Sequence, residues 1–151
     1  MVIRWLVAAV HLLALGFGLG AVWARGRALR QAPDEGAVRF ALGADAAWGI
    51  AALLWVSTGV WRAFGGLEKG TAYYLGNHVF WAKMALFVAI VAIEIPMAVT
   101  LGRWRAGLRR GAAIDTARAG TFATLGTVQA VLVVAMVLAA TAMARGFGYV
   151  G

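Results

Sequence analysis

Cysteine is absent from this chain of 151 residues. Its absence excludes disulfides, zinc–thiolate sites, iron–sulfur clusters and thiol catalysis. Charged residues are scarce as well, at 13 % of the chain, whereas soluble domains carry about 25 %. Hydrophobic residues make up 63 %, against about 45–50 % in soluble domains. This composition argues against a water-soluble protein, and the length predicts one domain over residues 1–151.

The sequence also lacks the motifs of common soluble enzymes. It contains no Walker loop and no G-x-S-x-G, and its Gly16-x-Gly18-x-Gly20 run follows no strand, as a dinucleotide fingerprint would. Acidic residues are few, so the net charge is +8. In a soluble protein this surplus would suggest nucleic acid. Here basic loops of a membrane protein explain it, and no nucleic-acid partner is predicted.

Four apolar runs are long enough to cross a bilayer as helices, which takes about 20 residues each. Strict two-residue alternation is absent, which argues against a membrane β-barrel. In lipid each run must satisfy its own backbone hydrogen bonds, so we interpret all four as helices. The prediction is an all-α, multi-pass integral membrane four-helix bundle. Its spans are 3–24, 38–60, 77–99 and 121–144, and the arginine-rich segment 102–120 is a candidate for a short surface helix.

Basic residues are distributed unevenly between the two ends of such a bundle. Lys and Arg collect in cytoplasmic loops. The first and third loops with their flanks hold nine basic residues, and the other side holds four. This predicts a bacterial inner-membrane protein with both termini outside. The nine are Arg25, Arg27, Arg30, Arg39, Arg103, Arg105, Arg109, Arg110 and Arg118, and the four are Arg4, Arg62, Lys69 and Arg145.

Ionisable residues inside the spans are the informative positions, because each costs several kcal/mol unless it is paired or useful. His11 and Lys83 lie at nearly the same depth in the outer half, and His78 lies higher, at a helix end. His78 and Lys83 are about 140° apart around one helix, so they cannot both point at one ligand atom. Asp45 and Glu94 lie near the cytoplasmic end.

A neutral imidazole among apolar helices suits a b-type haem, which needs one or two axial imidazoles in an apolar cleft. We expect His11 to be the principal iron ligand, with His78 or Lys83 as the second. Gly18 would leave room for the macrocycle, Trp81 would help to line the cleft, and Lys83 could instead pair with a propionate. The predicted function is cytochrome b-like redox chemistry or electron transfer. Quinone and porphyrinogen are the candidate partners, and an oxidoreductase activity stays open.

Two other functions use the same residues. In a haem-free proton or cation permeation module, His11, Lys83, Asp45 and Glu94 would form the path. In a membrane scaffold or assembly subunit, apolar helix faces would serve partners, and the surface left by four helices favours a homodimer. Plain structural roles also exist: His11 can bond a neighbouring helix, and Asp45 and Glu94 can pair with Arg25, Arg39 or Arg103. Asn77–His78 also suits a helix start.

Three stretches carry a family resemblance: HLLALGFGLGAVWARGRALR, ADAAWGIAALLWVSTGVWR and GLEKGTAYYLGNHVFWAKMALF. They resemble an uncharacterised bacterial family of small four-helix membrane proteins, known only as a domain of unknown function. More distantly, the layout is similar to the copper-resistance D-like superfamily, which includes the J-type protoporphyrinogen oxidases with haem b. The shared features are His11, Arg25 and the step Trp81-Ala82-Lys83. The resemblance implies haem or metal at His11, although the oxidases have histidine where this chain has Trp81.

Overall fold

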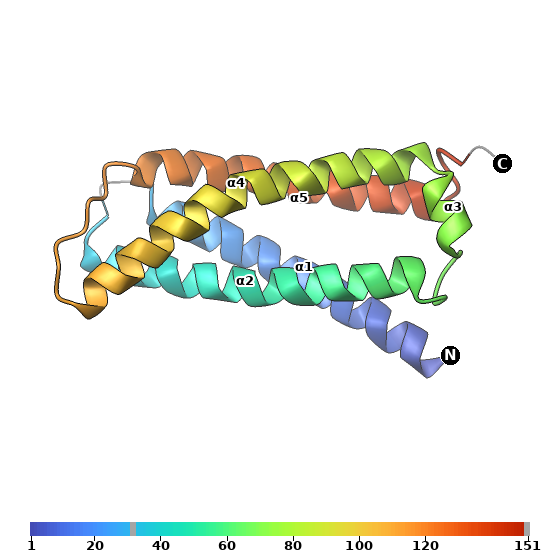
Figure 1. Cartoon of the computed structure of the whole chain (residues 1–151), viewed down its shortest axis with the longest axis horizontal. Coiled ribbons are helices and arrows are strands. Elements are labelled where there is room, and N and C mark those ends of the chain that lie inside the picture. The colour runs from blue at the N-terminus through green and yellow to red at the C-terminus, as the bar shows by residue number, and fades with distance from the viewer. Residues whose placement is uncertain (31–32, 150–151) are drawn as a thin grey trace.

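The described part of the chain folds into four long helices and one short one. The computed structural model describes residues 1–30 and 33–149. The long helices run side by side, the short helix α3 lies at one end, and both chain termini lie at that same end (Figure 1). The helices are α1 (Val2–Ala28), α2 (Glu35–Phe64), α3 (Thr71–Leu75), α4 (His78–Arg109) and α5 (Ala119–Ala144).

The four predicted spans are confirmed as the four long helices, all apolar enough to cross a membrane. At 26 to 32 residues each, they measure about 39–48 Å, which exceeds the hydrocarbon core of about 30 Å. Each long helix exceeds its predicted span: α1 and α2 at both ends, α4 at its C-terminal end and α5 at its N-terminal end. In particular, α4 continues to Arg109, so the arginine-rich segment is largely the end of this helix and not a separate surface helix. The short α3 within 65–76 was not predicted.

Asparagine and aspartate side chains fix where two of the long helices start. The Asp34 carboxylate accepts the Ala37 N–H at 2.7 Å at the start of α2. Asn77 caps α4, as predicted: its side-chain oxygen accepts the N–H groups of Val79 and Phe80. The Asn77 Nδ2 also donates to the Phe147 carbonyl at 3.0 Å, which ties the segment after α5 to the start of α4.

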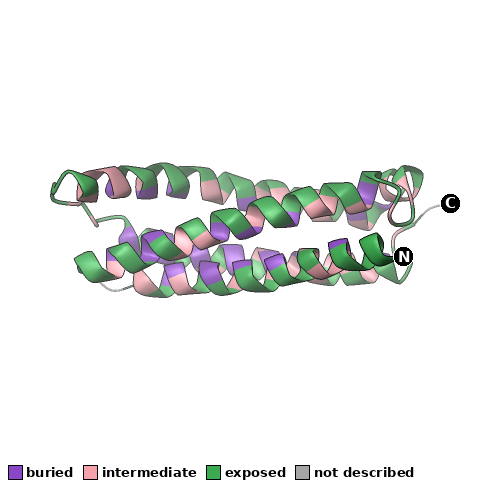
Figure 2. Cartoon of the chain, turned by 90° about the horizontal axis from the view of Figure 1, so that it is seen from below, coloured by how far each residue is buried: buried purple, intermediate pink, exposed green. Residues whose placement is uncertain are grey.

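The long helices bury one side each and turn apolar side chains outward. Figure 2 shows buried residues on the sides that face one another and exposed residues on the outer surfaces. The outer side chains include Leu13, Leu53 and Val131, which are 73 %, 71 % and 63 % exposed. An apolar exterior of this kind is what a lipid environment requires and what water would penalise.

Two clusters of buried residues hold the bundle together. One lies at the end away from the chain termini and combines all four long helices, where α4 crosses toward the start of α2 (Figure 1). It contains Trp104, whose side chain is buried in the core near the arginine-rich end of α4. The second lies near the middle of the bundle. Its largest members are Trp48, Trp55, Ile90, Val133 and Met136.

Small residues on α1 serve two different sides of the helix. A Cβ atom on Gly18 would come within 3.0 Å of the Trp48 ring, so the absence of a side chain at Gly18 allows that indole to pack against α1. Gly16 and Gly20 lie on the exposed side, where a Cβ would meet nothing within 4 Å. The room expected beside Gly18 for a flat cofactor is therefore filled by Trp48.

Candidate functional site

His11 bridges α1 and α2 in the half of the bundle nearest the termini. Its Nδ1 lies 2.9 Å from the hydroxyl oxygen of Thr58. The buried positions of α1 include Val7, Ala14 and Gly18, and His11 falls on the same stripe at spacings of three and four residues. The imidazole therefore faces the interior of the bundle, where it is half-buried.

The Thr58 hydroxyl determines which nitrogen of His11 carries the proton. Its oxygen lies 2.6 Å from the Leu54 carbonyl, which can only accept, so the hydroxyl donates its proton there. The same oxygen must then accept from the imidazole, and Nδ1 carries the hydrogen of a neutral His11. Nε2 keeps a free lone pair, and it makes no hydrogen bond within the described part of the chain. A neutral ring with this tautomer can ligate a metal or accept a proton through Nε2.

Aromatic and cationic residues surround this imidazole. The Trp55 ring centroid lies 6.1 Å from that of His11, and a Cβ on Gly59 would approach the ring at 3.2 Å. Arg62 follows Thr58 by four residues on α2, so this cation lies on the same side of that helix as the hydroxyl that bonds His11. Lys83 follows the buried Phe80 by three residues on α4, so it belongs to the inward stripe of that helix. Arg62 is held by Glu68 at 2.8 Å.

The other residues predicted around a cofactor lie elsewhere. His78 is exposed at the first position of α4, and its backbone N–H donates to the Gly148 carbonyl at 2.9 Å. Trp81 is 55 % exposed, and its indole N–H donates to the Leu75 carbonyl. Within residues 1–30 and 33–149, no group of three or more His, Asp and Glu side chains is arranged to hold a metal. His11 and Lys83 are thus the two predicted residues that share the interior.

A buried ionic cluster joins all four long helices nearer the opposite end. Arg25 of α1 has no exposed surface. It donates to Asp45 of α2 at 2.7 Å, to both carboxylate oxygens of Glu94 of α4 at 2.9 and 3.0 Å, and to Gln129 of α5 at 2.7 Å. The Gln129 amide in turn donates to Glu94 at 2.7 Å. One side chain from each spanning helix therefore meets at a single guanidinium.

The charges of this cluster are nearly balanced. Arg25 is one cation between two carboxylates, and Arg105 supplies a second cation 3.6 Å from the other oxygen of Asp45. The Arg25 Nε is the one nitrogen of that guanidinium with no partner among the described residues. Charges removed from water need such partners, and an arrangement that leaves few donors free can persist inside a bundle.

The sequence predicted part of this arrangement. Asp45 and Glu94 were expected to pair with Arg25, Arg39 or Arg103, and Arg25 is the partner of both. Arg39 instead pairs with Glu35 on its own helix at 2.6 Å. Gln129 completes the cluster, and its hydrogen bonds with Arg25 and Glu94 explain why this amide is buried.

Thr58 was missed by the sequence analysis. The signal that pointed toward it was weak: a hydroxyl on the helix after His11 whose depth matches that of the imidazole.

Comparison with known proteins gives one match. No curated protein and no solved structure matches the chain. A family model described as "Predicted membrane protein (DUF2214)" matches residues 3–148, nearly the full length. This agrees with the four apolar helices and with the resemblance to a membrane-protein family of unknown function. The chain belongs to this family of predicted membrane proteins.

Proposed function

We propose that this membrane protein binds a b-type haem in the half of the bundle nearest its termini and uses it for redox chemistry. The observation that carries the proposal is the free Nε2 of His11, fixed as an acceptor by the Nδ1–Thr58 hydrogen bond. Imidazoles that ligate metals characteristically donate their other N–H to a neighbouring acceptor, which orients the ring. Haem would supply one-electron chemistry at that position.

A second residue of the proposed site would pair with a haem propionate. Lys83, inward-facing and half-buried, is the cation placed to pair with a haem propionate, whereas His78 is exposed at the end of α4. The proposal therefore takes Lys83 and not His78 as the second residue of the site. Arg4 and Lys69 are two further cations at this end of the bundle, but they donate to the Gly66 carbonyl and the Tyr73 hydroxyl. A quinone or a porphyrinogen remains the candidate electron partner.

The orientation belongs to the proposal as well. The end of α1, the start of α2, the end of α4 and the start of α5 lie at one end of the bundle, and the start of α1 and the end of α5 lie at the other (Figure 1). The end of the bundle where α1 meets α2 and α4 meets α5 carries the surplus of arginine. Because basic residues collect on the cytoplasmic side, this end would face the cytoplasm of a bacterial cell. The site at His11 would then lie in the outer half of the inner membrane.

The absorption spectrum of the purified full-length protein tests the proposal. Expressed with added haem precursor, the wild type should show a Soret band and a reduced-minus-oxidised difference spectrum. His11→Ala should abolish both, whereas His78→Ala, which removes the only other histidine, should preserve them. A colourless wild-type protein, or equal loss in the two variants, would overturn the assignment.

The alternatives give different outcomes in the same preparation. A proton or cation permeation module would be colourless and would show pH-dependent flux in liposomes. Arg25 opposes that function, because a fully buried cation lies between Asp45 and Glu94 on the route. A scaffold would be colourless, show no flux, and keep its partner complexes when His11 and Lys83 are replaced by neutral residues.

A further inference from the structure

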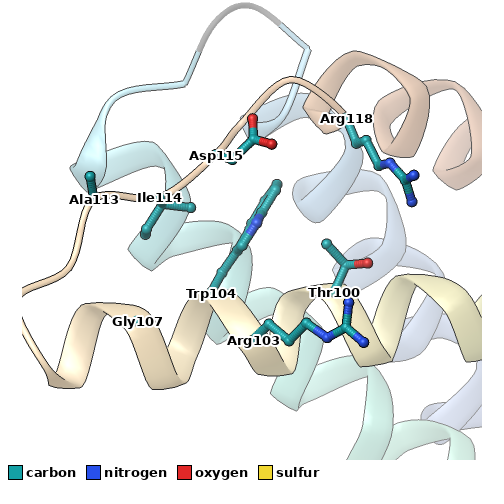
Figure 3. A pocket seen from close by; sticks show the side chains of 8 residues that line it. All are labelled: Thr100, Arg103, Trp104, Gly107, Ala113, Ile114, Asp115 and Arg118. Atoms are coloured by element: carbon teal, nitrogen blue, oxygen red, sulfur yellow. The ribbon is translucent and has the colours of Figure 1, made fainter.

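A pocket of about 380 Å³ opens at the end of the bundle opposite His11. It lies between the last turns of α4, the segment that follows this helix, and the start of α5 (Figure 3). No part of it belongs to the haem site proposed above or to the Arg25 cluster. Its lining includes two cations, one carboxylate, one hydroxyl and two apolar side chains, which belong to Arg103, Arg118, Asp115, Thr100, Trp104 and Ile114.

Two cations of the pocket have no partner in the described part of the chain. Arg103 comes from α4 and Arg118 directly precedes α5, and both extend to the same side of the opening in Figure 3. Other arginines of this chain hold carboxylates, as Arg39 and Arg62 do. The guanidinium groups of Arg103 and Arg118 are exposed and make no hydrogen bond or ion pair with residues 1–30 or 33–149, although each carries five donors.

The acidic residue of the pocket does not neutralise this pair. The Asp115 carboxylate accepts the backbone N–H of Ala117 at 2.9 Å, which shapes the turn before α5. Two arginines and one aspartate leave the lining with a net charge of +1. The Thr100 hydroxyl donates to the Pro96 carbonyl at 3.0 Å, so the free side-chain donors of the pocket are the two guanidinium groups and the indole N–H of Trp104.

The position of the pocket indicates where its ligand comes from. Arg103 lies four residues beyond the predicted end of the apolar run of α4, where the boundary between hydrocarbon and water is expected. The buried indole of Trp104 and the half-buried Ile114 give the pocket an apolar wall. Basic pockets between spanning helices bind the phosphorylated headgroups of anionic lipids, and arginine suits phosphate because its planar fork contacts two oxygens at once.

We propose that this pocket binds the phosphate of an anionic phospholipid headgroup, held by Arg103 and Arg118. A phosphate ester is the shared chemistry of a lipid and of a soluble metabolite. The lipid is favoured because the pocket adjoins the membrane boundary and has an apolar wall. The size agrees with ligand pockets in general, which start at about 300 Å³.

Binding of a short-chain phosphatidylglycerol to the full-length protein in neutral detergent, measured by titration calorimetry, tests this proposal. Arg103→Gln with Arg118→Gln should weaken binding at least about tenfold, because two charge-assisted contacts are lost. Arg109→Gln with Arg110→Gln is the matched control. It removes the same charge from two exposed arginines of the same segment outside the pocket, and it should change the affinity less than about twofold. Equal losses would show attraction to a basic surface only and would overturn the site.

Two further measurements distinguish a lipid from a soluble phosphate as the ligand and provide a second variant in case the first one misfolds. Glycerol 3-phosphate and inorganic phosphate should bind far more weakly than the lipid, and displacement of the lipid at equal concentration would overturn the lipid assignment. Asp115→Asn keeps the acceptor for Ala117 but removes a negative charge from the pocket. It should tighten lipid binding by about threefold, as removal of a repulsion at a partly exposed site predicts. Unchanged or weaker binding in a folded Asp115→Asn protein would contradict the proposal.

Discussion

The Arg25 guanidinium of α1 meets the Glu94 carboxylate of α4 through two parallel hydrogen bonds, from Nη1 to Oε1 at 2.9 Å and from Nη2 to Oε2 at 3.0 Å. The side chains make this link although the backbones of α1 and α4 do not pack directly against each other. This two-pronged geometry is the arrangement in which arginine and carboxylate bind most strongly. Helices in lipid gain little hydrophobic energy from association, so packing and polar contacts must hold them. The pair therefore contributes to the relative placement of α1 and α4, which are not neighbours in sequence.

Arg25→Met should destabilise the bundle strongly. It removes the cation shared by Asp45 and Glu94 and leaves two carboxylates without their main partner, at a cost of about 3–5 kcal/mol. Arg27→Met on the same helix removes an exposed arginine and should change the stability by less than about 0.5 kcal/mol. Reversible unfolding of the purified protein in mixed micelles measures both. Equal stability of the two variants would show that the cluster does not stabilise the fold.

Gln129 and Glu94 should be coupled in a double-mutant cycle. Gln129→Leu removes an acceptor from Arg25 and a donor from Glu94, which should cost about 1–3 kcal/mol. Because the two residues share one network, the loss in the double variant with Glu94→Gln should differ from the sum by about 0.5–3 kcal/mol. A cycle of Gln129→Leu with Glu35→Gln, which lies in an exposed pair, should be additive. Additivity in both cycles would contradict the network.

The spans and the ionic cluster were predictable because both follow from the high free-energy cost of unpaired polar groups in lipid. Leaving backbone groups or charges unpaired in lipid is costly, so apolar run length predicted four helices, and the scarcity of buried charge predicted that Asp45 and Glu94 find arginines. Which arginine they find depends on helix rotation, and the sequence left three choices.

The finer parts of the site depend on packing that hydropathy does not encode. The acceptor for His11 is the hydroxyl of Thr58 on another helix. The space beside Gly18 is filled by the indole of Trp48, which is distant in sequence. The continuation of α4 through Arg103 to Arg109 was missed for a different reason. The Arg, Leu and Ala residues of this stretch favour helix formation but do not form an apolar run. The helix therefore continues beyond the residues that hydropathy identifies as a span.

Thr58→Val should change the proton position on His11. Valine keeps the shape but removes the acceptor for Nδ1–H, so the neutral ring should shift toward a mixture of tautomers. In a His78→Ala background only His11 contributes imidazole signals, and its ¹⁵N chemical shifts in the cofactor-free protein report which nitrogen is protonated. Thr58→Ser should keep the wild-type spectrum because the hydroxyl remains. A wild-type spectrum in Thr58→Val would mean that the hydroxyl does not determine the tautomer.

Asn77→Ala should loosen the end of the bundle near the termini. Asn77 is fully buried, caps α4 through two N–H groups and donates to Phe147, so its loss removes a cap and leaves buried groups unpaired. The cap alone is worth about 0.5–2 kcal/mol. Hydrogen exchange should show faster exchange at Val79 and Phe80, with residues around Arg25 unchanged. Asn77→Asp, which retains the accepting oxygen, should keep most of the protection. Exchange that accelerates uniformly along the chain would point to general destabilisation and not to a local cap.

Gly18→Ala should destabilise the protein, whereas Gly16→Ala should not. Alanine is favoured over glycine in a helix by about 0.5–1 kcal/mol, and at Gly16 nothing opposes that gain. At Gly18 the new methyl would lie 3.0 Å from the buried Trp48 ring, which has little room to move, and overpacking of this kind costs about 1–3 kcal/mol. Trp48→Phe should recover part of the loss in the double variant, because it shortens the side chain that clashes. Equal stability of the two single variants would mean that Trp48 does not fill the space beside Gly18.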